Sequence, residues 1–230
     1  MRFLAVLLLL VAVQVAAASC PEPSSSELPG LDLPFTPVQV IEVKPWKRDF
    51  CVALVATPDS EEKRAFAVAL FTAGEGPLPG RLIASSGRVE LGPDDSAASL
   101  DLAKYAVSAT QTAIGVRIRR HRYYAGGGEA SLEMLRLYLR RGRDLRPILM
   151  TCMSYESDLA GDWLEDGTRD RVGNSGQATL SVGKKTTQGH FDLLRKTDAG
   201  TQRLRWDAGA YVEVDDDPFA RVVLDVFDDH

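Results

Sequence analysis

The sequence has few of the residues on which common enzyme chemistries depend. It contains only three cysteines and three histidines in 230 residues. It has no G-x-S-x-G nucleophile elbow, no H-E-x-x-H metal motif and no P-loop. A nucleophilic set of Cys152, His190 and Asp192 can be drawn, but no spacing supports it, and a cysteine held in a disulfide is not a nucleophile. We therefore predict a protein that is not an enzyme and needs no cofactor.

The sequence also lacks an excess of positive charge. Its formal net charge is −5, and the C-terminal stretch from Val212 to His230 holds most of the acidic excess. Because proteins that bind nucleic acid are normally basic overall, we expect no nucleic-acid partner.

Only one long apolar run is present, from Phe3 to Val13, and it is too short for a transmembrane helix, which needs about 20 residues. One arginine precedes the run and the small residues "VAAASC" follow it. This order is typical of a secretory signal peptide, which we place at residues 1–19. Residues 20–36 are rich in Pro and Ser and are predicted to form an extended tether.

The cleavage site has two interpretations. Ala16–Ala18 offers an ordinary A-x-A site before Ser19, and the residues up to Cys20 also resemble a bacterial lipobox. In the second case Cys20 would be the lipidated first residue, and a tether directly after it favours this case. The expected location is then the periplasm, with a lipid anchor to the bacterial envelope as the only membrane contact.

The other two cysteines, Cys51 and Cys152, lie in strand-like runs. In an oxidising compartment we expect them to form a disulfide that closes a loop of about 100 residues. The alternative is two separate buried thiols that act as small apolar side chains.

Short strand-like runs punctuated by Gly, Pro, Asp or Ser fill the rest of the chain. Residues 113–124 and 131–141 alternate apolar and polar side chains, the mark of antiparallel sheet with one wet face. We predict one domain, residues 37–230, with an all-β fold: an antiparallel β-sandwich or propeller-like sheet with at most one or two short helices. The helix candidates are residues 59–71 and 95–109.

Three glycines, Gly126–Gly128, separate the two alternating runs. A phosphate-binding loop would need a lysine and a following helix, and neither is present. The glycines are therefore predicted to supply the positive φ angles of a hairpin turn. The same two runs carry a basic face, which is either solvated or a docking surface for an anionic partner: Arg117, Arg119, Arg136, Tyr138 and Arg140.

Four aspartates, Asp158, Asp162, Asp166 and Asp170, recur every four residues. They could form an acidic stripe on a helix or surround Ca²⁺ in a loop, but the spacing is not that of an EF-hand. A long solvated loop is the default prediction. Calcium is the alternative to the prediction of no cofactor, and Asp215–Asp217 before Pro218 are predicted to form an acidic turn.

The segments "RYYAGGGEASLEMLRLYLRRGRDLRPIL" and "GHFDLLRKTDAGTQRLRWDAGAYVEV", within residues 112–214, resemble the β-rich part of bacterial periplasmic immunity proteins and lipoproteins that are similar to periplasmic lysozyme inhibitors. The resemblance implies a sandwich-like fold whose surface loop plugs the cleft of a muramidase. An acidic protein would also be steered electrostatically towards such enzymes, which are usually basic.

Those inhibitors present a loop of the form S-G-x-x-Y. The chain has two partial matches, in which Glu90 and Thr179 replace the tyrosine. The candidate inhibitory residues in and near them are Ser86, Gly87, Arg88, Arg171, Asn174, Ser175 and Gly176. The resulting hypothesis is an immunity or inhibitor protein with a secreted or periplasmic muramidase as its partner, and the alternative is a structural or assembly lipoprotein of the envelope.

Overall fold

The structure is a computed structural model that describes residues 20, 39–60, 63–74, 80–92 and 94–214. The predicted signal peptide, all of the tether after Cys20 and the acidic stretch after residue 214 lie outside the described residues. Within them the chain forms strands and no helix, which confirms the all-β prediction. No helix that could cross a membrane occurs in this part of the chain.

The thirteen strands are β1 Gln39–Pro45, β2 Phe50–Ser60, β3 Lys63–Thr72, β4 Leu82–Ser85, β5 Val89–Glu90, β6 Asp95–Ala106, β7 Thr112–Tyr123, β8 Gly128–Arg141, β9 Asp144–Trp163, β10 Arg169–Thr187, β11 His190–Thr197, β12 Gly200–Asp207 and β13 Ala210–Glu213. Nearly all pairs are antiparallel; the exception is one parallel contact, Ser85 with Asp144.

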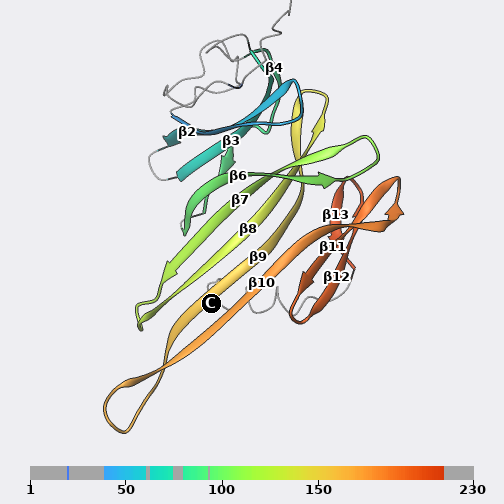
Figure 1. Ribbon diagram of the computed structural model, residues 1–230. Helices are drawn as coiled ribbons and strands as arrows, with labels where there is room; N and C mark the ends of the chain where they lie inside the picture. Colours follow the sequence, from blue (N-terminus) through green and yellow to red (C-terminus); the bar gives the residue numbers. More distant parts are fainter. Residues whose placement is uncertain (1–19, 21–38, 61–62, 75–79, 93, 215–230) are drawn as a thin grey trace, which may run out of the picture.

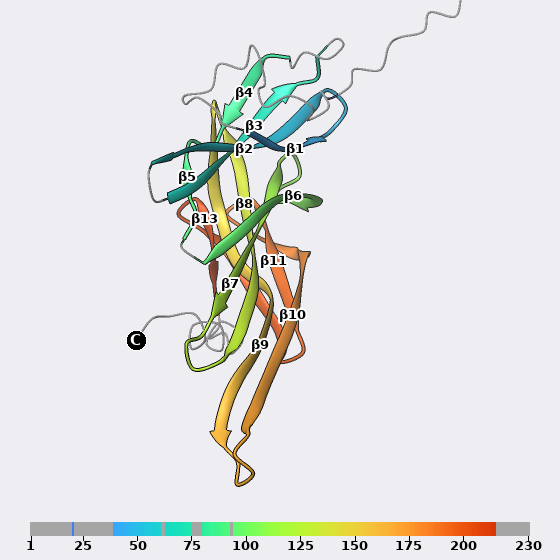
Figure 2. The same cartoon turned by 90° about the vertical axis from the view of Figure 1, so that its left-hand side faces the viewer.

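Hydrogen bonds join the strands into one strongly bent sheet that folds into three layers (Figures 1 and 2). The central layer contains β6, β7, β8 and β9, together with the first half of β10. The N-terminal layer contains β1–β5. The second half of β10 leaves the central layer and continues with β11–β13 as the C-terminal layer.

One face of the central layer, here called face 1, packs against the C-terminal layer. Leu135, Leu137 and Leu139 of β8 point to this face and are almost completely buried. They share a core with residues of β9 and of the C-terminal layer, which include Ile148, Met153, Leu193, Leu204, Trp206 and Tyr211. The predicted apolar face of residues 131–141 is confirmed.

The opposite face, here called face 2, packs against the N-terminal layer. Ile114, Val116 and Ile118 of β7 and Tyr138 of β8 form a second core there. Their partners from β2 and β3 include Val52, Leu54, Phe66, Val68 and Leu70. The alternation predicted that one face of these strands is exposed to solvent. In the structure, β7 and β8 instead pack against another layer on each face.

Both helix candidates are strands. Residues 59–60 end β2, residues 63–71 belong to β3, and residues 95–106 form β6. Every residue of β3 from Ala65 to Phe71 is buried, because its two faces belong to different apolar clusters. A strand buried on both sides has no alternating pattern, so its sequence resembles that of a buried helix.

The disulfide joins Cys20 to Cys51, and Cys152 is a free, buried thiol. Cys51 and Cys20 belong to a cluster on the N-terminal layer, whereas Cys152 lies on β9 in another cluster with Ala130 and Leu132. The predicted Cys51–Cys152 bridge is therefore wrong. This disulfide and the predicted lipidation of Cys20 exclude each other, because one sulfur atom cannot form both a disulfide and the thioether of a lipid anchor.

The glycine triplet forms the turn between β7 and β8, as predicted. Gly127 and Gly128 have φ angles of 97° and 104°, in the region that favours glycine. A Cβ on Gly128 would lie 2.3 Å from the carbonyl oxygen of Asp158 on β9. The turn therefore also lets β9 approach the start of β8 closely.

Candidate functional site

The end of the β9–β10 hairpin projects beyond the rest of the sheet (Figures 1 and 2). The last residue of β9 that pairs with β8 is Leu159, opposite Gly128. Beyond it, β9 and β10 pair only with each other, up to Trp163 and Arg169. We call residues 160–171 the hairpin end.

The turn of the hairpin end is closed by local hydrogen bonds. The Leu164 N–H donates to Thr168 O at 2.7 Å, and Gly167, with φ of 80°, supplies the left-handed position. Asp166 Oδ1 accepts from the Thr168 hydroxyl at 2.6 Å and from the Thr168 N–H at 2.9 Å. These bonds favour the ionised carboxylate and lower the pKa of Asp166.

Contacts with the neighbouring β7–β8 turn brace the hairpin end. The Arg169 guanidinium donates to Gly126 O and lies 5.2 Å from the centroid of the Trp163 ring. The Ala160 N–H donates to Gly127 O at 3.2 Å. The hairpin end is thus held against the β7–β8 turn by one main-chain bond and by the Arg169 guanidinium.

The hairpin end exposes apolar surface that a folded protein usually buries. Trp163 is 70% exposed, and Leu164 and, just beyond, Val172 are also exposed. Between residues 158 and 171 the chain has five acidic residues and two arginines. An aromatic side chain on an acidic, rigid protrusion is suited to a basic protein partner with a concave surface.

The structure corrects the long solvated loop predicted around the four aspartates. Asp158 and Asp170 lie in β9 and β10, and Asp166 lies in the turn. Asp158 forms an ion pair with Arg171 at 3.2 Å. No group of three or more possible metal-ligating side chains occurs among residues that the structure describes.

The two partial S-G-x-x-Y matches lie far apart. Ser86, Gly87 and Arg88 connect β4 to β5, and the Ser86 hydroxyl accepts a bond from the Val68 N–H at 2.9 Å. This connection follows Ser85, which pairs with Asp144, the first residue of β9. The hairpin end contains Trp163, the last residue of β9, so the β4–β5 connection and the hairpin end lie at opposite ends of that strand.

The second match is not a loop. Arg171, Asn174, Ser175 and Gly176 lie within β10 and pair with β9, so the prediction that these residues belong to a protruding loop is wrong. The residues of this stretch are almost all exposed on both faces of the strand, so its sequence has no alternation of apolar and polar side chains that would have predicted a strand. Their main chain pairs on one side only, which makes this half of β10 an exposed edge strand next to the hairpin end.

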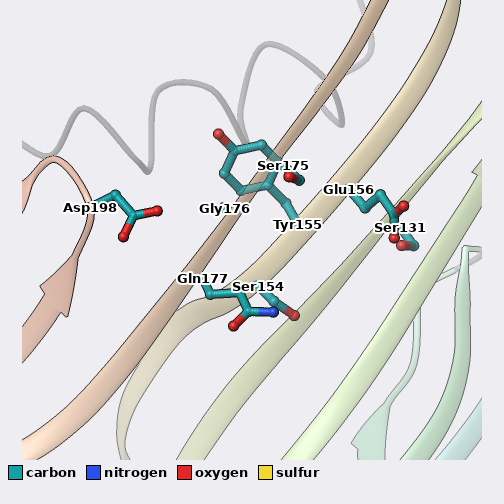
Figure 3. Close-up of a pocket in the computed structure, with 8 residues that line it drawn as sticks. All are labelled: Ser131, Ser154, Tyr155, Glu156, Ser175, Gly176, Gln177 and Asp198. Carbon is teal, nitrogen blue, oxygen red and sulfur yellow. The ribbon is translucent and has the colours of Figure 1, made fainter.

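A polar groove crosses face 1 between the hairpin end and the C-terminal layer (Figure 3). Two cross-strand rows build it: Ser131, Glu156 and Ser175 stand opposite one another on β8, β9 and β10, and Ser154 stands opposite Gln177. Asp198, in the β11–β12 turn, borders its far side. The pocket has a volume of about 470 Å³, and Tyr155 and Gly176 complete its lining.

The predicted basic face does not exist as one surface. Arg117 stands opposite Leu135 in the β7–β8 register, so Arg117 and Arg119 lie on face 1, while Arg136, Tyr138 and Arg140 lie on face 2. Tyr138 is only 1% exposed. Residues directly opposite in an antiparallel pair share a face, and the register could not be read from the sequence.

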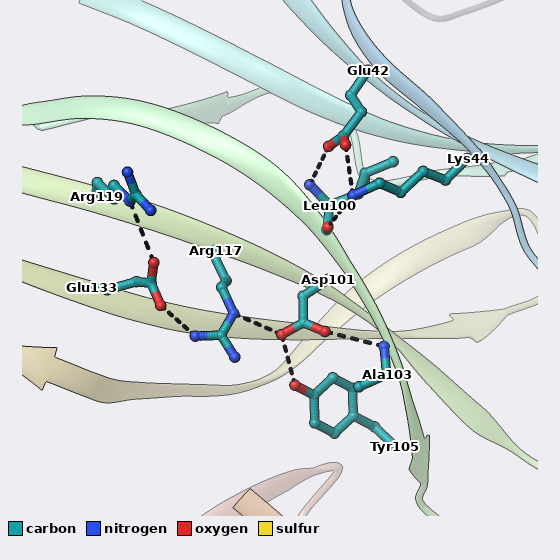
Figure 4. A network of polar contacts seen from close by, with 9 residues as sticks. All are labelled: Glu42, Lys44, Leu100, Asp101, Ala103, Tyr105, Arg117, Arg119 and Glu133. Carbon is teal, nitrogen blue, oxygen red and sulfur yellow. Dashed lines mark hydrogen bonds and ion pairs between the residues drawn. The ribbon is translucent and has the colours of Figure 1, made fainter. Parts of the chain in front are cut away.

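Arg117 and Arg119 belong instead to a polar network on the central layer (Figure 4). Arg117 donates to Asp101 at 2.7 Å and to Glu133, which also accepts from Arg119 at 3.4 Å. Asp101 further accepts from the Tyr105 hydroxyl at 2.8 Å and from the Ala103 N–H at 3.0 Å. The network ties the edge strand β6 to β7 and β8.

Opposing effects set the pKa of Asp101. Burial alone would raise it, but hydrogen bonds from Ala103, Arg117 and Tyr105 together hold the pKa below the usual range. A carboxyl whose folded pKa is depressed contributes stability above its unfolded pKa, near 3.9, and that contribution is lost as pH falls through the folded pKa.

We therefore expect Asp101→Asn to lower the free energy of unfolding by about 1–2 kcal/mol at pH 7, since it weakens hydrogen bonds to a charged group. The difference from wild type should shrink below about pH 4. Urea unfolding at pH 7 and pH 3 measures both values. Asp144→Asn is the control, because Asp144 and its ion-pair partner Arg146 are exposed and contribute about 0–1 kcal/mol. An equal loss at both pH values would contradict the assignment.

The considered nucleophile is not activated. Burial raises the pKa of the Cys152 thiol to about 11. His190 is stacked on the Trp206 ring at 3.8 Å, and Asp192 accepts from the Thr187 hydroxyl at 2.7 Å. These contacts hold both side chains in structural roles.

Comparison of the chain with protein-family models, with curated proteins and with solved structures gives no match. The resemblance to lysozyme inhibitors stays a prediction from the sequence.

Sequence reasoning missed the exposed Trp163 and the polar groove. The dipeptide Asp166-Gly167 between two strand-forming stretches is a hairpin signal that could have located the turn. No comparable signal exists for the groove, because its residues come from three strands and one turn that are separate in the sequence.

Proposed function

We propose that the protein is an exported binding protein that inhibits a lysozyme-like cell-wall hydrolase by inserting the hairpin end into the enzyme's cleft. The observation that carries the proposal is the projecting, braced hairpin with Trp163 exposed at its tip. A binding element held rigid before contact loses little conformational entropy on binding. Aromatic residues at such positions are frequent hot spots.

Two further features support the proposal. The Cys20–Cys51 disulfide suits the oxidising compartment that the N-terminal sequence predicts. The acidic residues around Trp163 would attract a basic enzyme and speed its association at low salt. Arg171 could exchange its exposed partner, Asp158, for a carboxylate in the cleft, because an exposed ion pair is weak.

The test is inhibition of muramidases in a turbidity assay, with a panel that includes the enzyme encoded nearest this gene. We expect the wild-type protein to inhibit at least one enzyme, and Trp163→Ala to weaken inhibition at least about tenfold without a change in melting temperature. Met150→Ala is the matched control, since Met150 is an exposed apolar side chain of β9 far from the tip.

A second pair of variants separates the two sequence candidates. Arg171→Ala should weaken inhibition, whereas Arg88→Ala, beyond the opposite end of β9, should not. Inhibition lost with Arg88→Ala but kept with Trp163→Ala would move the contact to the β4–β5 connection. Indifference of every muramidase to the wild-type protein would end the proposal.

A further inference from the structure

We infer that the polar groove on face 1 is a binding site for an uncharged oligosaccharide. The inference is independent of the proposed function, because the groove and the tip of the hairpin end share no residue. It begins from an arrangement that only the folded sheet creates, in which polar side chains of β8, β9 and β10 stand in adjacent rows across three strands.

The first step is that these polar groups are not used inside the protein. The side chains of Ser131, Ser154, Glu156, Ser175, Gln177 and Asp198 make no hydrogen bond or ion pair with any residue in the described ranges. The neighbouring network on the same face is the opposite case, since Asp101, Arg117 and Glu133 satisfy one another (Figure 4). The groove therefore offers donors and acceptors that remain available to a ligand.

The second step is the chemical character of the lining. It consists of three hydroxyls, one amide and two carboxylates, together with Tyr155 and Gly176, and it has no cationic side chain (Figure 3). The absence of a cation among these residues disfavours a phosphate. Small-molecule pockets of about 300–1,000 Å³ are usually lined mainly by apolar side chains, so a polar pocket of about 470 Å³ favours a hydrophilic ligand.

The pairing of the sheet below the groove disfavours a peptide as the ligand and favours a saccharide. The main-chain groups of β8 and β9 below the groove are already paired within the sheet, and a strand added to the free edge of β10 would lie beside the groove and not over it. An extended peptide therefore cannot fill the groove by strand addition. Sugar hydroxyls can donate to Glu156 and Asp198 and can accept from Gln177 and the serines. A second pocket of about 330 Å³, lined in part by Arg119 and Arg120, shares Ser131 and Ser154 and lies towards β7. It gives room for a further sugar ring beyond the uncharged ligand's site in the groove.

The test is isothermal titration of the protein with chitotetraose, cellotetraose and maltotetraose. We expect at least one of them to bind with a Kd of about 1 mM or tighter, in the range where weak specific binding is measurable. Gln177→Ala and Asp198→Asn should each weaken binding at least fivefold. Both side chains are exposed, so neither change should lower the melting temperature.

The chain provides a matched control for Asp198. Asp198-Ala199-Gly200 occurs at the β11–β12 turn, and Asp207-Ala208-Gly209 occurs at the β12–β13 turn, away from the groove. Asp207→Asn and Trp163→Ala should both leave sugar binding unchanged. Binding of spermidine with no response to any of the three sugars would overturn the inference in favour of an amine site. No response to any sugar, or equal affinity in the Asp198→Asn and Asp207→Asn variants, would also overturn it.

Discussion

Replacing Gly128 with alanine should destabilise the protein by about 2–6 kcal/mol, far more than the same change at the other two glycines of the triplet. Two costs combine at this position. The φ angle of 104° is unfavourable for any residue with a side chain, which costs about 1–3 kcal/mol. The new Cβ would also lie 2.3 Å from Asp158 O and 2.8 Å from Leu159 Cα, and a backbone clash of this kind costs about 1–3 kcal/mol more.

The triplet contains its own controls. Gly127 has a φ angle of 97°, but a Cβ there would meet only the Ala160 methyl at an ordinary 3.5 Å, so Gly127→Ala should cost about 1–2 kcal/mol. Gly126 has no positive φ, and its Cβ would meet only the Arg169 guanidinium at 3.8 Å. Gly126→Ala should therefore change stability by less than about 0.5 kcal/mol. Urea unfolding of the three variants gives the order directly.

The same series bears on the proposed function. Gly128 faces the main chain of β9 just where β9 leaves the sheet to form the hairpin end. A shift of β9 at this point would change the direction in which Trp163 projects. Equal losses of stability at the three positions would show that the triplet acts only as a flexible turn, and that Gly128 does not set the position of β9.

The sequence predicted β7 and β8 well because apolar and polar side chains alternate along both strands, whereas β6 and the first half of β10 in the same layer were predicted as a helix candidate and a loop. In β7 and β8 the pattern alternates over many residues, and each strand and the turn between them lies where alternation placed it. The prediction failed for β3, where both faces are buried and the alternation disappears. It also failed for the bridge, because cysteine pairing depends on which layers meet, and no local pattern contains that information.

The side on which a residue lies was harder to predict than its secondary structure. Whether Arg117 shares a face with Arg136 depends on the register of β7 and β8, and a shift of one residue reverses the answer. The polar groove needs two such registers at once, between β8 and β9 and between β9 and β10, and then the position of the β11–β12 turn. Each register is set by packing of the whole core. The division of the arginines between two faces and the polar groove could therefore not be predicted from the sequence.

The three-layer arrangement predicts the second large loss of stability, on replacement of Tyr138. The sequence pattern placed Tyr138 on a solvated face, opposite Leu135, Leu137 and Leu139. In the structure Tyr138 is 1% exposed and packs in the core between β8 and the N-terminal layer. Truncation of a buried aromatic side chain costs about 3–5 kcal/mol, and we expect this loss for Tyr138→Ala.

Two neighbours on β8 make the comparison decisive. Leu137→Ala removes a side chain from the core on face 1 and should cost about 2–5 kcal/mol under either arrangement, because Leu137 is fully buried. Arg140→Ala changes an exposed residue on the same face as Tyr138 and should cost less than about 0.5 kcal/mol. Large losses for both Leu137→Ala and Tyr138→Ala require two cores on opposite sides of one strand. If Tyr138→Ala instead behaved like Arg140→Ala, the N-terminal layer would not cover face 2, and the central sheet would be open to solvent on that side.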